Sequence, residues 1–75
     1  MVSELERVAL TVDLPAHHLK TGDMGTVVDI TTDGQEITIE FFTLDGETHA
    51  VVPVTPDQVR RVGGKEIAHA RVMVG

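Results

Sequence analysis

Histidine side chains are the first candidates for chemistry in this sequence. Four histidines are present, and two of them, His17 and His18, are adjacent. Adjacent side chains on an extended chain point to opposite sides, so these two imidazoles are poorly placed to ligate one ion together. No compact set of His, Asp and Glu has a familiar metal-ligand spacing. We therefore expect exposed loop histidines, no metal site and no cofactor.

Nucleophilic and acid–base catalysis find little support in the residue types. The chain has no cysteine, its only serine is Ser3 near the N-terminus, and no Gly-x-Ser-x-Gly elbow occurs. The carboxylates Asp29, Glu36 and Glu40 are scattered across expected strands, and a domain this small rarely contains a deep cleft. The sequence therefore predicts no catalytic residues and no enzyme activity for the isolated chain.

Charge is distributed unevenly along the chain. Twelve acidic residues against six basic ones give a net charge of -6, which disfavours contact with nucleic acid or an anionic membrane. Through Pro56 the basic residues are only Arg7 and Lys20, whereas four of the six basic residues follow it. This pattern suits electrostatic contact between the C-terminal part and the rest, within one chain or between copies. The alternative is ordinary solvated surface charge.

The sequence pattern indicates short strands. Runs rich in Val, Ile, Thr and Phe alternate with Gly, Asp and Pro at intervals of about 10 residues, which is typical of β-sandwiches and β-barrels. A first strand is expected over 7–12, followed by an irregular loop that Leu19 anchors in the core. Asp33-Gly34 and Asp45-Gly46 each separate two such runs and predict two-residue hairpins. Three strands with a defined register follow.

The two predicted hairpins agree on one buried row, Ile37, Ile39 and Phe41. The first turn pairs this row, in the same order, with Ile30, Val28 and Thr26, and the second pairs it with Val54, Val52 and Ala50. On the opposite face Val27, Phe42 and Val51 form an apolar outer patch, with His49 beside Phe42. Either the chain's own C-terminal strand or its long first loop covers this patch, or the patch forms an interface with another molecule.

The C-terminal third predicts a helical turn and further strands. Thr55 suits an N-cap and Pro56 the first helical position, before a short strand over 60–62. Gly63-Gly64 then provides a hinge, and the alternation over 67–74 predicts a sixth strand. The expected fold is all-β. Residues 1–62 form a small SH3-like barrel of five strands with one short helical turn, and 63–75 form a C-terminal strand extension of the same domain.

One stretch of the sequence resembles a known family. The run Leu19–Val28, followed by Ile39-Glu40-Phe41 and Leu44–Thr48, resembles short bacterial proteins grouped as domain of unknown function 4926, over roughly residues 5 to 62. This resemblance implies a small SH3-like barrel without an established activity. It also implies a stand-alone partner of neighbouring gene products, including an antitoxin or immunity role. The Gly-Asp-x-Gly-Thr-Val piece is similar to KOW modules and to nitrile hydratase beta-subunit barrels.

These observations favour a non-catalytic, cytoplasmic protein-interaction module that self-associates as a homodimer by strand addition through its C-terminal strand. No apolar run approaches the roughly 20 residues of a membrane span. The alternatives are a KOW-like RNA or ribosome-associated barrel and an antitoxin, immunity or enzyme-accessory partner. The candidate interaction residues combine the outer patch with the C-terminal extension: Val27, Phe42, His49, Val51, Ile67, His69, Arg71 and Met73.

Overall fold

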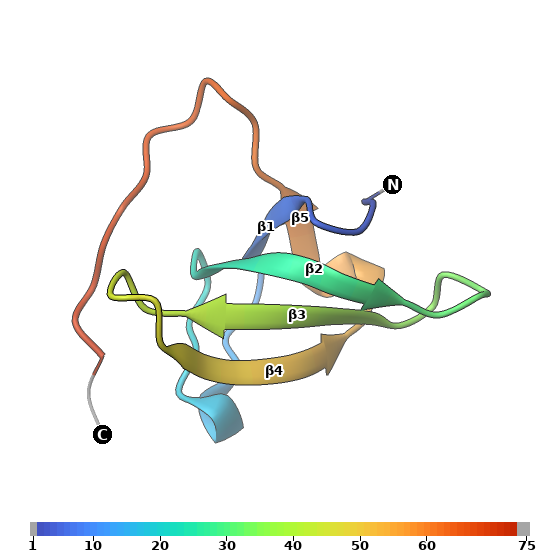
Figure 1. Cartoon of the computed structure of the whole chain (residues 1–75), viewed down its shortest axis with the longest axis horizontal. Coiled ribbons are helices and arrows are strands. Elements are labelled where there is room, and N and C mark those ends of the chain that lie inside the picture. The colour runs from blue at the N-terminus through green and yellow to red at the C-terminus, as the bar shows by residue number, and fades with distance from the viewer. Residues whose placement is uncertain (1, 74–75) are drawn as a thin grey trace.

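The computed structural model describes residues 2–73, which form an all-β fold with one antiparallel sheet in the order β4-β3-β2-β1-β5 (Figure 1). Its strands are β1 (Arg7–Leu10), β2 (Met24–Ile30), β3 (Ile37–Phe42), β4 (Thr48–Val54) and β5 (Val59–Arg61). Two 3-10 turns complete the elements, η1 (Pro15–His17) and η2 (Pro56–Gln58). The predicted all-β fold of five strands is confirmed, as is the helical turn before the last strand. In the described part of the chain no helix is long and apolar enough to cross a membrane.

The hydrophobic core lies on one face of the sheet and draws on every strand. The alternation of β3 places Ile37, Ile39 and Phe41 in the centre of this face, as predicted, because residues at period two share a side of a strand. Leu19 enters the core from the loop before β2, as expected. The core side chains are Val8, Leu10, Leu19, Val27, Ile37, Ile39, Phe41, Val52, Val54 and Val59.

The register between β2 and β3 follows the prediction only near the turn. Ile30 pairs with Ile37, but the register shifts at Val28, so that Val27 pairs with Ile39. Val27 is fully buried, whereas Val28 is 39% exposed. Placing Val28 in the core and Val27 in the outer patch was therefore wrong. A β-bulge sets two residues against one and reverses the sides of everything beyond it, and two adjacent valines give no local sign of which one is buried.

The register between β3 and β4 matches the prediction over most of its length. Ile37, Ile39 and Phe41 pair with Val54, Val52 and Ala50. Phe42 pairs with Thr48 and not with His49, because the register shifts there. The connection is longer than predicted and shifts the pairs next to it by one residue, and the extra residue at His49 restores the predicted register for the remaining pairs.

Both Asp-Gly turns differ from the two-residue loops that we expected. The Gly34 N–H donates to the Thr31 carbonyl and the Gly46 N–H to the Thr43 carbonyl, each at 2.9 Å. Each turn is therefore centred one residue earlier, and each glycine follows it with a positive φ of 72° or 89°. Each turn is therefore a hairpin connection of more than two residues, in which the glycine adopts the left-handed conformation.

A Thr-x-Asp pair recurs at three turns, a repeat that the sequence analysis missed. The Oγ1 atoms of the threonines donate to an Oδ1 atom of the aspartate two residues later: Thr31 to Asp33, Thr43 to Asp45, and Thr55 to Asp57. At η2 the predicted boundary is confirmed, since the Thr55 N–H donates to Gln58 Oε1 at 2.9 Å. The three pairs stabilise connections of the same sheet by the same local contact.

The C-terminal tail, residues 62–73, is not a strand. Its last backbone hydrogen bond to the sheet runs from the Val62 N–H to the Arg7 carbonyl at 3.1 Å. The predicted sixth strand is therefore wrong over 67–73, and Val74 lies outside the described residues. In Figure 1 the tail (orange to red) arches away from β5 and returns past the turn between β3 and β4. Alternating apolar residues make a strand only where an edge is available to pair with them.

Candidate functional site

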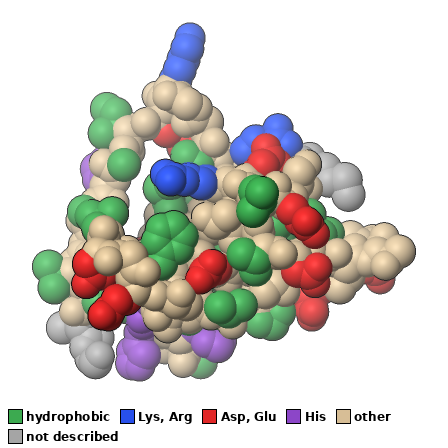
Figure 2. All heavy atoms as spheres, in the orientation of Figure 1, with side chains coloured by type: hydrophobic (Ala, Val, Ile, Leu, Met, Phe, Trp, Pro, Cys, Tyr) green, Lys and Arg blue, Asp and Glu red, His purple; other side chains and the backbone are tan. Residues whose placement is uncertain are grey.

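A cavity of about 550 Å³ lies between the C-terminal tail and the sheet, where β2 begins and β3 ends. We call it the tail cavity. Figure 2 shows the hollow between the arching tail and the body, with hydrophobic side chains on both sides of it. Met24 and Phe42 line it from the sheet, and Ala68 and Ala70 line it from the tail. The tail cavity is therefore an apolar hollow whose outer wall is a segment without secondary structure.

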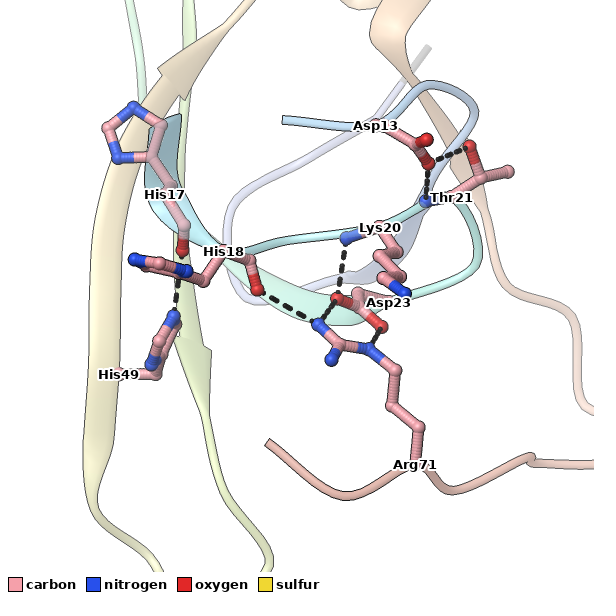
Figure 3. Close-up of polar contacts among 8 residues, drawn as sticks. All are labelled: Asp13, His17, His18, Lys20, Thr21, Asp23, His49 and Arg71. Atoms are coloured by element: carbon pink, nitrogen blue, oxygen red, sulfur yellow. Dashed lines mark hydrogen bonds and ion pairs between the residues drawn. The ribbon is translucent and has the colours of Figure 1, made fainter. Parts of the chain in front are cut away.

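One side chain fastens this outer wall to the body. Arg71 Nε donates to Asp23 Oδ1 at 2.8 Å, and Arg71 Nη2 donates to Asp23 Oδ2 at 2.5 Å. The same Nη2 also donates to the carbonyl oxygen of His18 at 3.0 Å (Figure 3). The side chains of Arg71 and Asp23 are 29% and 17% exposed. This two-point pairing of guanidinium and carboxylate is the geometry that makes arginine–carboxylate contacts strong and directional.

The electrostatics of the pair favour both charged forms. Burial alone would raise the pKa of Asp23, but hydrogen bonds from Arg71 and from the Lys20 N–H outweigh it and hold this pKa below its usual value. The hydrogen bond to Asp23 raises the pKa of Arg71 in turn. Both groups are therefore ionised at neutral pH, and the contact is a full ion pair.

The loop between β1 and β2 positions the acceptors of this ion pair. Leu14 and Leu19 exchange backbone hydrogen bonds of 2.9 and 3.1 Å, which close the loop around η1. His18, at the end of η1, has a left-handed φ of 56°. Asp13 accepts from the Thr21 N–H and Oγ1 at 2.8 and 2.9 Å, and these bonds lower the Asp13 pKa. The loop is thus ordered by its own contacts.

The histidines do not assemble into a metal site in the part of the chain that the structure describes. His49 Nε2 lies 2.8 Å from the carbonyl oxygen of His17, which joins β4 to η1 (Figure 3). His17, His18 and His69 are exposed. Over residues 2–73 no group of three or more His, Cys, Asp or Glu could hold a metal ion. The contact of His49 positions the loop beside β4.

The structure brings together five of the eight candidate interaction residues around the tail cavity: Phe42, His49, His69, Arg71 and Met73. The other three lie elsewhere. Val51 is exposed on the outer face of β4, Ile67 is exposed on the tail, and Val27 belongs to the core. Sequence reasoning missed Asp23 because nothing in its spacing links it to Arg71. The one available signal was the contrast between the acidic N-terminal part and the more basic C-terminal part. Electrostatic contact between these parts was one of its two interpretations, and the ion pair is such a contact.

Fold and cavity together define a small all-β domain with a tail docked against one end of its sheet. A family model described as Domain of unknown function (DUF4926) matches residues 4–61, and the chain belongs to this family. The match ends before the tail. No curated protein matches the chain, and no solved structure matches it. The SH3-like type of barrel therefore stays a prediction.

Proposed function

We propose that this protein is a non-catalytic protein-interaction module that self-associates by exchanging its C-terminal tail between two copies. The observation that carries the proposal is the weak attachment of the tail. Among the described residues, Arg71 makes all of the hydrogen bonds that join 67–73 to the body. Ile67 and Val72 are 86% and 84% exposed. Large apolar side chains that a small domain leaves exposed on one segment are typical of contact surfaces.

Residues 63–66, at the start of the tail, form a tight turn. The Gly63 N–H donates to Glu66 Oε2 at 2.6 Å, and the Glu66 N–H donates to the Gly63 carbonyl at 3.2 Å. Arg60 pairs with Glu66 at 2.7 Å on the surface. Because Gly64 lies inside this turn, rotation there would break both contacts, whereas rotation beyond Glu66 keeps the turn and redirects the segment that follows it.

Exchange would repeat the observed contacts between two chains. Arg71 of one copy would bind Asp23 of the other, so no ion pair is lost, and Ile67 and Val72 would gain burial between the copies. This gain matters for a chain of 75 residues, because a domain of this size buries a smaller fraction of its unfolded surface than a larger domain does. The tail carries Lys65 and Arg71 against Glu66, and this small positive excess complements the acidic body. We assign this role to the bacterial cytoplasm.

Light scattering coupled to size-exclusion chromatography tests the proposal on the full chain over a range of concentrations. We expect the dimer fraction of the wild type to rise with concentration and Arg71→Ala to lower it. Lys65→Ala is the matched control, because it removes a tail cation that has no part in the Asp23 contact and should leave the dimer fraction unchanged. A wild type that stays monomeric throughout, or an Arg71→Ala variant that dimerises equally well, would contradict the proposal.

A further inference from the structure

We infer that Asp23 and the carbonyl of His18 form a binding site for an arginine side chain in an extended segment of a partner protein, and that Arg71 is a tethered occupant of this site. The inference rests on the proposed function and deepens it, since it names the chemical group that the tail cavity recognises. The occupant is an extended segment of a partner protein that presents an arginine beside an apolar residue, and a peptide of this chain's own tail serves as the first probe.

The acceptor geometry selects a guanidinium group. Two carboxylate oxygens of Asp23 meet two different nitrogens of Arg71 at 2.8 and 2.5 Å, and the His18 carbonyl meets one of them from another direction at 3.0 Å. A planar guanidinium reaches all three acceptors at once from a fixed fork. The ammonium group of lysine is a point charge and cannot reproduce the two parallel bonds to the carboxylate.

The acceptors are held in place by contacts that do not involve Arg71. The Lys20 N–H donates to Asp23 Oδ2 at 2.8 Å, and the Asp23 carbonyl accepts from the Leu10 N–H at 2.9 Å. The His18 N–H donates to the Pro15 carbonyl at 3.1 Å, which orients the peptide that carries the third acceptor. Figure 3 shows the His18 carbonyl and the Asp23 carboxylate, both on the loop between β1 and β2, pointing toward the Arg71 guanidinium. A site that is ordered before binding loses less entropy when it is occupied.

The boundary of the family separates the site from its occupant. His18 and Asp23 lie within the matched residues 4–61, whereas Arg71 lies beyond them. The binding site therefore belongs to the family domain, and the arginine belongs to a segment appended to it. A covalently attached ligand faces its site at an effective concentration in the millimolar range, so the tail masks the site from weaker free ligands.

The tail cavity adds an apolar requirement beside the arginine. Its wall on the sheet includes Met24 and Phe42, and the apolar lining from the tail is Ala68, Ala70 and Met73. The cavity between these walls measures about 550 Å³. A partner segment with a larger apolar residue near its arginine would fill this space and gain burial that the chain's own tail does not provide.

Fluorescence anisotropy with a labelled peptide of residues 65–75 tests the site on the full-length Arg71→Ala variant. We expect saturable binding that weakens by about tenfold or more when the peptide carries Arg71→Ala, as expected for losing charge-assisted hydrogen bonds. A peptide with Arg71→Lys should bind with an affinity between these two. The wild-type chain should bind the arginine peptide more weakly than the Arg71→Ala chain, because its own tail competes. Equal affinities for the three peptides, or no binding of any of them, would overturn the inference.

Two double variants locate the peptide on the protein. Asp23→Asn with Arg71→Ala should lose the preference for arginine, whereas Asp13→Asn with Arg71→Ala should keep it, because Asp13 lies in the same loop but contacts Thr21. Retention of the preference without the Asp23 carboxylate would overturn the inference. If arginine-dependent peptide binding holds while the full chain stays monomeric, exchange between copies fails and the arginine site stands. If a dimer forms and the three peptides bind alike, exchange stands and the arginine site fails.

Discussion

The sheet body (residues 4–61) and the C-terminal tail (62–73) both carry alternating apolar residues, but only the body forms strands. The body pairs five strands in one sheet and buries a core of ten side chains on one face of that sheet. The tail carries alternating apolar residues as well, yet it forms no strand, and Ile67 and Val72 remain exposed. The body is stabilised by many cooperative contacts, whereas among the described residues beyond Glu66 the hydrogen bonds to the body all come from Arg71. Alternation specifies a strand only when a partner edge and a face to cover are both within reach.

The largest difference in the free energy of unfolding is expected between alanine substitutions of two isoleucines, one in the body and one in the tail. Ile39→Ala removes a fully buried side chain from β3, which pairs with a strand on each side, and should lower the free energy of unfolding by about 2–5 kcal/mol. Ile67→Ala removes a side chain that is 86% exposed and should change it by less than about 0.5 kcal/mol. Urea denaturation followed by circular dichroism measures both. A large loss of stability for Ile67→Ala would show that the tail belongs to the folded core.

The second largest difference in stability is expected between alanine substitutions of two glycines, one in β2 and one in the tail. A Cβ atom at Gly25 would lie 2.4 Å from Ile39 Cγ2 and 2.8 Å from the Glu40 carbonyl oxygen, so Gly25→Ala should cost about 1–3 kcal/mol. At Gly64 nothing lies within 4 Å of the added atom, and Gly64→Ala should be close to neutral. Thermal unfolding of the two variants measures the difference. Equal melting temperatures would contradict the tight packing of β2 on β3.

Turn glycines should give a smaller contrast of the same kind. Gly46 has a φ of 89°, so Gly46→Ala places a side chain in the left-handed region at a cost of roughly 1–2 kcal/mol, although nothing lies within 4 Å of the new atom. Gly63 has no such backbone requirement, and its added Cβ would make only an ordinary contact with Glu66 at 3.6 Å. Chemical denaturation should therefore separate Gly46→Ala from Gly63→Ala. An unchanged midpoint for Gly46→Ala would contradict the strained backbone at the turn.

The ion pair between body and tail should have the smallest effect on stability and a defined pH dependence. Asp23→Asn should lower the free energy of unfolding by less than about 1 kcal/mol at pH 7, as expected for a partly exposed pair. Because the folded state lowers the Asp23 pKa, its carboxylate stabilises the fold above its unfolded pKa of about 3.9. That contribution is lost as the pH falls through the lower, folded-state pKa. Urea denaturation from pH 7 to pH 2 should show the difference between variant and wild type disappearing at the acid end, and a constant difference would contradict this account.

Local patterns predicted a large part of the fold. The row of Ile37, Ile39 and Phe41 and its three partners on β4 were confirmed, as was the turn that begins at Pro56. The errors fell where the register shifts. A bulge at Val28 exchanged the environments of two identical neighbours, and the extra residue at His49 displaced the partner of Phe42. Neither shift changes the pattern of apolar and polar residues enough to be recognised.

The candidate site was less accessible from the sequence than the fold. Five of the eight candidate interaction residues surround the tail cavity, because the tail and the end of β3 were already expected to lie on the outer face. Asp23 and the His18 carbonyl were missed, although they hold the tail. A backbone carbonyl carries no signature in the sequence, and a carboxylate in a glycine-containing turn resembles any other turn residue.

The sequence by itself determined an all-β chain, its buried row on β3 and the places of its turns, because period-two alternation and turn-forming residues act between neighbours in the chain. Tertiary structure alone decided which of Val27 and Val28 is buried, and that residues 67–73 form no strand. It also decided that Arg71 meets Asp23. These outcomes depend on how the folded sheet positions distant residues, and the ion pair joins groups 48 positions apart. No local preference encodes such a distance, so only the assembled fold specifies it.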